Sequence, residues 1–270
     1  MSSNEKYEQL LRIIREQEAV AVAFSGGVDS SFLCYAAVQA LKDKALAITV
    51  VSPMLPKTEI DWAKRIAVQT GIRHILIEEN DIDSAVAANP RDRCYHCKKI
   101  EFGTIIAEAK KAGAKTVLDG SNMDDENDYR PGLKALAELA VLSPLRQAGL
   151  NKTEIRELSK QAGLPTWDKP AFACLASRFP YGEHITVEKL AQVESAEEIV
   201  RHAGFVNFRV RYHGTIARIE VAPEERAKFF NILFLDTLSA QIKQCGFLYA
   251  AFELEGYRMG SLNAVSTTEK

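Results

Sequence analysis

Ala19-Val-Ala-Val-Ala-Phe-Ser-Gly-Gly-Val-Asp-Ser30 joins an unbroken apolar run to a glycine pair and the start of a helical pattern. An apolar run without polar alternation is typical of a strand that is covered on both faces. Further runs of this kind, separated by helical patterns, follow along the chain. The expected strands are 19–24, 45–51, 72–77, 115–118 and 139–142, and the expected helices are 29–41, 57–70 and 94–112. Strand–helix–strand order predicts an α/β fold with a parallel sheet.

The pattern changes after about residue 180. Asn151, three residues before Glu154, predicts the start of one more helix of the first part, which ends near 163–165. Beyond the change we expect a helix at 187–200, strands at 207–212 and 215–221, a long helix at 223–244 and a strand at 247–254. This order predicts a smaller C-terminal α+β domain. With the boundary at 179–182, the expected domains are 1–180 and 181–270.

Composition limits the class of protein. The chain has 270 residues with 34 basic and 36 acidic side chains, a net charge of −2, which argues against nucleic-acid binding by bulk charge. No run of about 18 apolar residues is present, so we expect no membrane segment and a soluble, cytoplasmic protein. Five cysteines are an odd number and indicate thiols, metal ligands or catalysts rather than disulfides. Cys34 and Cys245 lie in or beside apolar helical patterns and are expected to be core residues.

The glycine pair lies where an open α/β sheet binds its ligands, at the carboxyl end of a strand. Gly26 and Gly27 let the backbone approach an anion, and the N-terminus of the following helix favours phosphate. Ser25 and Ser30 can add hydroxyl donors, and Asp29 can hold a metal ion or cap the helix. The alternative is a plain strand–helix turn with a serine cap. No G-x-x-x-x-G-K-[ST] or G-x-G-x-x-G pattern is present, which disfavours γ-phosphate hydrolases and dinucleotide oxidoreductases.

Taken as a whole, Ser25-Gly-Gly-Val-Asp-Ser30 resembles the PP-loop of ATP pyrophosphatases. The resemblance implies binding of ATP with Mg²⁺, cleavage between the α and β phosphates, and adenylation of a substrate oxygen. A second polar stretch, 119–132, follows the strand expected at 115–118. Its carboxylates would lie on the ligand side of the sheet, where they could bind Mg²⁺ or substrate. The alternative is a solvated acidic loop.

Three cysteines form a candidate metal site. Cys94 and Cys97 are three residues apart on an expected helix, so both sulfurs lie on one face. Cys174 is the plausible third ligand, and three thiolates can hold a [4Fe–4S] cluster with one iron left open. A zinc site with His96 as fourth ligand, a redox pair and simple burial are the alternatives.

Arginines alternate with apolar residues at 207–212, so Arg209 and Arg211 share a face of the strand. A two-residue turn at His213-Gly214 would place Arg209 opposite Arg218. Opposed like charges are unfavourable unless an anion lies between them, which indicates a bound phosphate group. The alternative is a solvated face on which Glu220 is a diagonal neutralising partner.

Four motifs together resemble the LarE family, the ATP-dependent sulfur transferases of lactate racemase maturation. They are SGGVDS at 25–30, DENDYRPGLKA at 125–135, Cys174 before SRFPYG at 177–182, and RVR at 209–211. The resemblance implies an adenine nucleotide α-hydrolase-like domain with a small C-terminal domain, and homo-hexamers built from trimers. It also implies a small nucleotide substrate, pyridinium-3,5-biscarboxylic acid mononucleotide, which is thiolated to the precursor of the nickel-pincer nucleotide. Arg209 and Arg211 match arginines near the phosphate site of that family.

The source of the sulfur is open at this point. Better-known members of the family have only the cysteine that matches Cys174 and give up its sulfur, leaving dehydroalanine. This chain also has Cys94 and Cys97, which is similar to a three-cysteine branch and to some tRNA thiolases, where a cluster carries the sulfur. We therefore expect a sulfur from sulfide on such a cluster, or from Cys174 itself, to displace AMP from an adenylated carboxylate. A tRNA thiolase and a non-catalytic nucleotide sensor are the rival functions.

Overall fold

The computed structural model describes residues 1–127, 131–170 and 173–258. They form two compact units, the first made of Met1–Asp81 with Asp92–Phe172 and the second of Ile82–Arg91 with the chain from Ala173 onward. The second unit thus combines a short internal segment, Ile82–Arg91, with the C-terminal part of the chain. Asn89 anchors that segment: its side chain donates to the Pro180 carbonyl at 2.6 Å, and its own carbonyl accepts from the Gly182 N–H at 2.9 Å.

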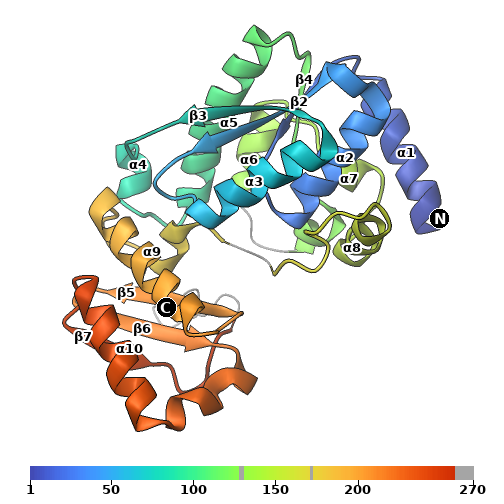
Figure 1. The fold of residues 1–270 in the computed structure, drawn as a ribbon. Helices are drawn as coiled ribbons and strands as arrows, with labels where there is room; N and C mark the ends of the chain where they lie inside the picture. The colour runs from blue at the N-terminus through green and yellow to red at the C-terminus, as the bar shows by residue number, and fades with distance from the viewer. Residues whose placement is uncertain (128–130, 171–172, 259–270) are drawn as a thin grey trace. The chain divides into compact units, whose positions relative to one another are not determined.

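A parallel sheet with the strand order β3-β2-β1-β4 forms the centre of the first unit (Figure 1). Its strands are β1 (Val20–Ala23), β2 (Ala45–Val51), β3 (Arg73–Glu78) and β4 (Thr116–Leu118). Its helices are α1 (Ser3–Arg15), α2 (Val28–Leu41), α3 (Lys57–Thr70), α5 (Arg93–Lys111), α6 (Pro131–Glu138), α7 (Pro144–Gln147) and α8 (Lys152–Gln161). The predicted α/β fold of the adenine nucleotide α-hydrolase type is thus confirmed.

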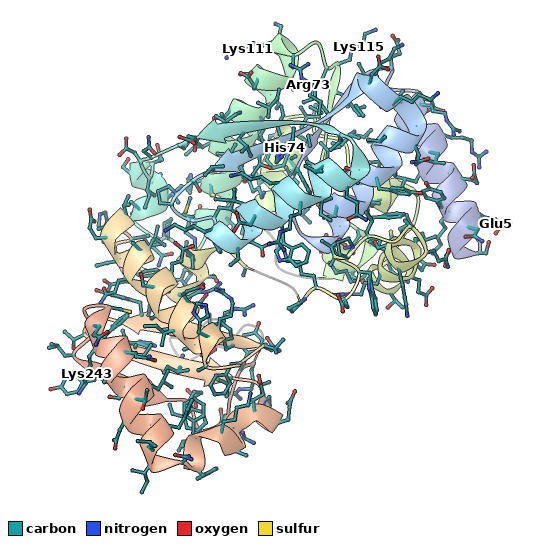
Figure 2. The ribbon with its side chains drawn as sticks, in the orientation of Figure 1. Glu5, Arg73, His74, Lys111, Lys115 and Lys243 are labelled. Carbon is teal, nitrogen blue, oxygen red and sulfur yellow. The ribbon has the colours of Figure 1, made fainter. Side chains whose placement is uncertain are left out.

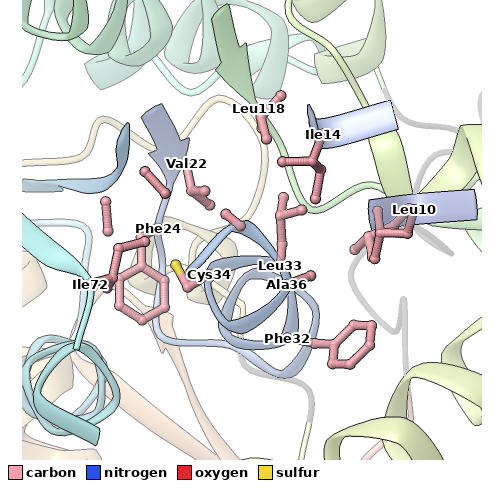
Figure 3. Close-up of a cluster of buried hydrophobic side chains, with 14 of the residues drawn as sticks. Leu10, Ile14, Val22, Phe24, Phe32, Leu33, Cys34, Ala36, Ile72 and Leu118 are labelled. Carbon is pink, nitrogen blue, oxygen red and sulfur yellow. The ribbon is translucent and has the colours of Figure 1, made fainter. Parts of the chain in front are cut away.

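β1 separates two apolar clusters because its side chains alternate between the faces of the sheet. Val20 and Val22 belong to a cluster filled from α1, α2, α3 and α8, shown in part in Figure 3. Ala21 belongs to the other cluster, which is filled from α5 and α6. The central strand is therefore covered on both faces, as its unbroken apolar run indicates, and its carboxyl end is held in place by two packed layers.

The strand expected at 139–142 is reduced to a single bridge between Leu118 and Leu142. The prediction of a fifth strand is wrong because the run is short and β4 itself pairs over only three residues. The capping box expected at Asn151 is confirmed: its side chain accepts from the Glu154 N–H at 2.9 Å, and the Glu154 carboxylate accepts from the Asn151 N–H at 3.0 Å. α8 begins directly after this box.

The second unit contains a sheet with the strand order β5-β6-β7. Its elements are α4 (Ser84–Ala87), a 3₁₀ helix (Leu175–Arg178), α9 (Val187–His202), β5 (Phe208–His213), β6 (Ile216–Val221), a 3₁₀ helix (Pro223–Phe230), α10 (Ile232–Gln244) and β7 (Tyr249–Phe252). The single long helix expected at 223–244 is wrong. Asn231 has an extended backbone and accepts a hydrogen bond from the Phe234 N–H at 3.0 Å, so it caps a new helix.

The register of β5 with β6 also differs from the expectation. Arg211 lies opposite Arg218, and Arg209 lies opposite Glu220. The loop is Gly214-Thr215 rather than His213-Gly214, because Gly214 takes the positive φ of +62° that the first loop position requires. The shift is two residues, so the arginines stay on one face of the strand but exchange their partners. In the described part of the chain, no helix is long and apolar enough to cross a membrane.

Candidate functional site

The loop that follows β1 is shaped by two glycines with different roles. Gly26 has φ +73°, and a Cβ added there would lie 2.7 Å from the Glu59 carbonyl oxygen of α3. Gly27 has φ −78° and would place an added Cβ 3.5 Å from Ser25 Oγ, an ordinary contact. Gly26 is therefore required by the fold, whereas a Cβ at Gly27 would make only an ordinary contact. The space over Gly27 is open for a ligand that approaches the backbone closely.

Backbone donors at the start of α2 complete this loop. Gly27 is the N-cap of α2 and supplies no side-chain acceptor to its first turn. The alternative of a serine-capped turn is therefore wrong: Ser30 Oγ donates to the Gly27 carbonyl at 3.3 Å and lies 3.1 Å from Ser25 Oγ. A helix N-terminus without a side-chain cap presents N–H groups and a positive dipole end, which suits a phosphate.

Asp29 lies in the first turn of α2, where Lys152 Nζ donates to its carboxylate at 2.5 Å and Asn122 Nδ2 donates at 3.3 Å. Its side chain is only 23% exposed. Lys152 is the first residue of α8, so the capping box described above sets the position of this ammonium group. A carboxylate and an ammonium group thus lie together at the mouth of the glycine loop, where a nucleotide phosphate would need charge compensation.

The acidic stretch after β4 is held by internal hydrogen bonds. Asp119 accepts from the hydroxyls of Ser121 and Ser143, and Asp125 accepts from the Asn122 N–H at 2.9 Å. An added Cβ at Gly120 would lie 3.1 Å from the Ser30 N, so this stretch packs directly against the first turn of α2. These carboxylates shape the loop that supports α2. Residues 128–130 of the same motif lie outside the described residues.

Lys169 is a residue of the site that sequence analysis missed. Its Nζ donates to the Gly26 carbonyl at 2.9 Å and to Glu59 Oε2 at 2.9 Å, and both side chains are 7% exposed. Burial lowers the pKa of Lys169 from its usual value, and the Glu59 carboxylate opposes this shift. No local pattern connects these residues, because the lysine reaches the loop from a segment that follows α8.

A polar pair in the sheet fixes the backbone just before the loop. Thr49 Oγ1 donates to the Phe24 carbonyl at 2.5 Å and lies 2.8 Å from Nε2 of His74, which is labelled in Figure 2. Because the hydroxyl has one proton and gives it to Phe24, His74 donates from Nε2 to Thr49. Burial, with a contribution from Lys64, lowers the pKa of His74, so the neutral ring is the form that the fold favours.

Cys94 and Cys97 are the second and fifth residues of α5, and Cys174 precedes the 3₁₀ helix Leu175–Arg178 of the second unit. Cys94 and Cys174 are exposed, and Cys97 is partly exposed. Among the described residues, no three His, Cys, Asp or Glu side chains are grouped as a metal site. Cys34 is buried as expected, but Cys245 is partly exposed at the end of α10, so its assignment to the core is wrong.

Arg178 holds the backbone around Cys174. The arginine is fully buried; it donates to the carbonyls of Ala173 and Cys174 at 2.7 and 3.1 Å, and its Nε donates to Glu197 at 2.9 Å. Glu197 also accepts from the Val210 N–H of β5 at 3.0 Å. The cysteine backbone is thus fixed to α9 and β5 by a network of charge-assisted hydrogen bonds.

The arginine face of β5 and β6 is buried and mostly paired with carboxylates. Glu220 accepts from both Arg211, at 2.8 Å, and Arg218, at 3.0 Å, so a glutamate separates the opposed pair. Arg209 is buried, donates to the Phe208 carbonyl at 2.6 Å and lies 4.8 Å from the centre of the Tyr257 ring. Burial and the nearby Arg178 charge lower the pKa of Arg209. Arg209 thus lies buried beside a second arginine charge.

The lowered pKa of His74 predicts a pH dependence of stability. Below about pH 6.5 the unfolded chain binds a proton at this histidine that the folded chain resists, so the free energy of unfolding falls as the pH falls. We expect denaturant titrations between pH 7 and 5.5 to show a loss below about 1 kcal/mol from this half-buried ring. The loss should shrink in His74→Gln, whose amide can still donate to Thr49. An equal loss in both proteins would contradict the assignment.

The family model of asparagine synthase matches residues 9–124 of this chain. Three relatives match nearly the whole chain. An uncharacterised protein of Synechocystis is 43% identical over 97% of this chain and 98% of its own length. An uncharacterised protein of Methanocaldococcus jannaschii is 29% identical over 90% of this chain and 92% of its own length. The pyridinium-3,5-bisthiocarboxylic acid mononucleotide synthase of Lactiplantibacillus plantarum is 37% identical over 97% of this chain and 95% of its own length. Such identity along both chains, on a PP-loop fold, shows that this chain belongs to the family of that synthase, the LarE family.

Proposed function

We propose that this chain is an ATP-dependent sulfur transferase that converts the carboxylates of pyridinium-3,5-biscarboxylic acid mononucleotide into thiocarboxylates. The observation that carries the proposal is the 37% identity to the synthase of that product, which extends over almost the full length of both chains. The uncapped glycine loop at the start of α2 supports it, because thiolation of a carboxylate needs an activating nucleotide.

In the proposed first half-reaction, the loop binds ATP. The N–H groups at Gly27 and the start of α2, with the hydroxyls of Ser25 and Ser30, would hold the phosphates. A substrate carboxylate oxygen attacks the α-phosphorus, and the bond to pyrophosphate breaks. Adenylation is needed because a carboxylate oxygen is a poor leaving group and AMP is a good one. Mg²⁺ would neutralise phosphate charge, and Asp29 could hold it in exchange for its contact with Lys152.

In the proposed second half-reaction, a sulfur nucleophile attacks the acyl carbon and AMP leaves with the bonding electrons. Cys174 can supply this sulfur: its thiol is exposed while Arg178 fixes its backbone. In that route the Cβ–S bond then breaks, the Cα proton is lost, and dehydroalanine remains.

Sulfide carried by a [4Fe–4S] cluster is the other proposed source, and we favour it for this three-cysteine chain. Cys94, Cys97 and Cys174 would hold the cluster, since thiolates are the ligands of such clusters and two of the three share one face of α5. Its open iron would bind exogenous sulfide. Cys97 also lies beside the ammonium group of Lys98. Burial lowers the pKa of Lys98, but Glu101 and the Cys97 sulfur raise it, and the pKa is raised overall.

The arginine face of the second unit is the proposed site for the substrate phosphate. Arg178, Arg209 and Arg211 are all buried in this unit, and burial and the charge of Arg178 lower the pKa of Arg209. A phosphate dianion would stabilise this group of buried positive charges. Arg211 contributes through its position beside Arg209 on β5.

Assembly as a homo-hexamer and a cytoplasmic location are further parts of the proposal, and they rest on the resemblance to the LarE family. The proposed partners are the mononucleotide and a sulfur donor, without nucleic acid or membrane. A net charge of −2 supports the exclusion of nucleic acid. A tRNA thiolase would retain RNA through purification, so an absorbance ratio typical of RNA-free protein is the expected result.

Gly27→Val tests the ATP half-reaction. A Cβ at this position makes only an ordinary contact, but the side chain would occupy the space over the backbone, so pyrophosphate release should fall at least about a hundredfold in a protein that still folds. Asp29→Ala should also abolish release. Gly26→Ala is the contrast: it should lower stability itself, because its Cβ would meet the Glu59 carbonyl. Full turnover by a folded Gly27→Val protein would exclude the loop as the ATP site.

Arg209→Met tests the phosphate site. We expect binding of the mononucleotide to weaken about tenfold to a hundredfold, the range for loss of one charge-assisted contact, while ATP binding stays unchanged. Arg201→Met, which removes an arginine at the surface of the same unit, is the matched control. Calorimetric titration with each ligand measures both affinities. If the affinity for both ligands falls equally, or for neither, the arginine face does not bind the substrate phosphate and its role is structural.

Single cysteine variants distinguish the two sulfur sources. With a cluster, anaerobic protein should contain about four irons per chain, turn over repeatedly with sulfide, and lose both properties in Cys94→Ala, Cys97→Ala or Cys174→Ala. Cys245→Ser is the control and should keep both. Iron analysis and intact-mass spectrometry are the measurements. If wild-type Cys174 loses the mass of hydrogen sulfide in one turnover while Cys94→Ala stays active, the sacrificial route replaces the cluster.

A further inference from the structure

Lys169 holds the carbonyl of Gly26, because its Nζ donates to this oxygen at 2.9 Å. A trans peptide group is planar, with its C=O and N–H directed to opposite sides. The bond that fixes the Gly26 oxygen therefore fixes the direction of the Gly27 N–H, which points away from the lysine. This N–H is one of the donors expected to bind phosphate.

Lys169 is itself held on three sides. Glu59 accepts its second hydrogen bond at 2.9 Å, and its ammonium group lies 5.2 Å from the centre of the Trp62 ring on the same helix. Its backbone is fixed as well, because Arg156 of α8 donates to the carbonyls of Trp167 and Lys169 at 2.6 and 2.8 Å. The lysine therefore has one position, and the loop carbonyl is attached to a rigid group.

A structural role in packing alone does not explain this arrangement. Burying an ammonium group and a carboxylate costs several kcal/mol per ion, and apolar side chains of similar size often stabilise a fold as well or better. α3 already packs closely against Gly26, since a Cβ added there would lie 2.7 Å from the Glu59 carbonyl oxygen. This packing constrains the position of the glycine. The lysine in addition constrains the rotation of the peptide group that follows it.

We propose that Lys169 is a positioning residue for ATP: together with Glu59 it orients the Gly26–Gly27 peptide so that the Gly27 N–H faces the phosphates before ATP binds. The inference rests on the proposed ATP site. Without the lysine, ATP would have to order this peptide itself. Ordering one residue of backbone corresponds to a loss of affinity of about tenfold.

The test removes both charges of the pair at once, because a single change would leave an uncompensated buried ion. In Lys169→Met with Glu59→Gln, we expect the KM for ATP to rise about tenfold while the KM for the mononucleotide stays within about twofold. This split is the decisive readout, since a general loosening of the fold would affect both substrates. Lys169→Arg, which keeps a charged donor, should restore most of the ATP affinity.

The control is Lys115→Met with Glu18→Gln. It removes an exposed lysine–glutamate pair of the same unit, joined at 2.5 Å, whose residues lie just before β4 and β1 and so at the end of the sheet opposite the glycine loop. Both KM values should stay as in the wild type. If the first double variant does not melt cooperatively, Lys169→Gln with Glu59→Gln, which keeps polar side chains in the site, takes its place with the same expected split.

Failure of this inference differs from failure of the proposed function. If the wild type binds no ATP, or if Gly27→Val binds it as well as the wild type, the ATP site is wrong and the role of Lys169 falls with it. If the wild type binds ATP, Gly27→Val does not, and the folded pair variant keeps the wild-type KM for ATP, the ATP site stands. Lys169 and Glu59 then serve only the packing of α3, and the positioning role is refuted.

Discussion

The left-handed turn at Gly26 is the constraint on which the first unit depends. The chain leaves the buried strand β1 and must reverse within a few residues to begin α2, while α3 packs so close that its Glu59 carbonyl would lie 2.7 Å from any Cβ at position 26. Only glycine satisfies both the φ of +73° and the contact. Thr49 donates to the Phe24 carbonyl before the turn, and Lys169 donates to the Gly26 carbonyl within it, so the direction of the turn is fixed at two points. The backbone of Gly27 follows directly after these two points.

Charge pairing has opposite consequences in the two units. In the first, Lys152 and Asp29 lie at the mouth of the loop with side chains that are still partly exposed, so a ligand can exchange with either. In the second, Glu220 is almost fully buried and engages two arginines, which leaves little freedom to exchange. A phosphate bound there, as proposed, would add to these ion pairs rather than displace a carboxylate. The proposed ATP site therefore has a partly exposed charge pair, and the proposed phosphate site has a buried one.

Sequence patterns predicted what depends on neighbours along the chain. The apolar run of β1, the capping box at Asn151 and the bounds of α3 follow from periodicity and capping chemistry. The β5–β6 register was misjudged because two adjacent loop positions, His213 and Gly214, fit the pattern, and only the φ of Gly214 distinguishes them. Lys169 could not be predicted, since its partners lie 143 and 110 residues away along the chain. A lone lysine in an irregular segment carries no local signal of such contacts.

Cys174 combines a fixed backbone with an exposed thiol. Arg178 donates to the carbonyls of Ala173 and Cys174, and Glu197 of the same unit compensates its charge. The thiol is exposed, so the fold restrains the main chain and leaves the sulfur accessible. Either proposed sulfur source uses this property: a sacrificed sulfur must reach an acyl carbon from a defined position, and a cluster ligand must be presented at a fixed distance. The two proposals therefore differ in whether Cys94 and Cys97 take part, and not in how the Cys174 backbone is held.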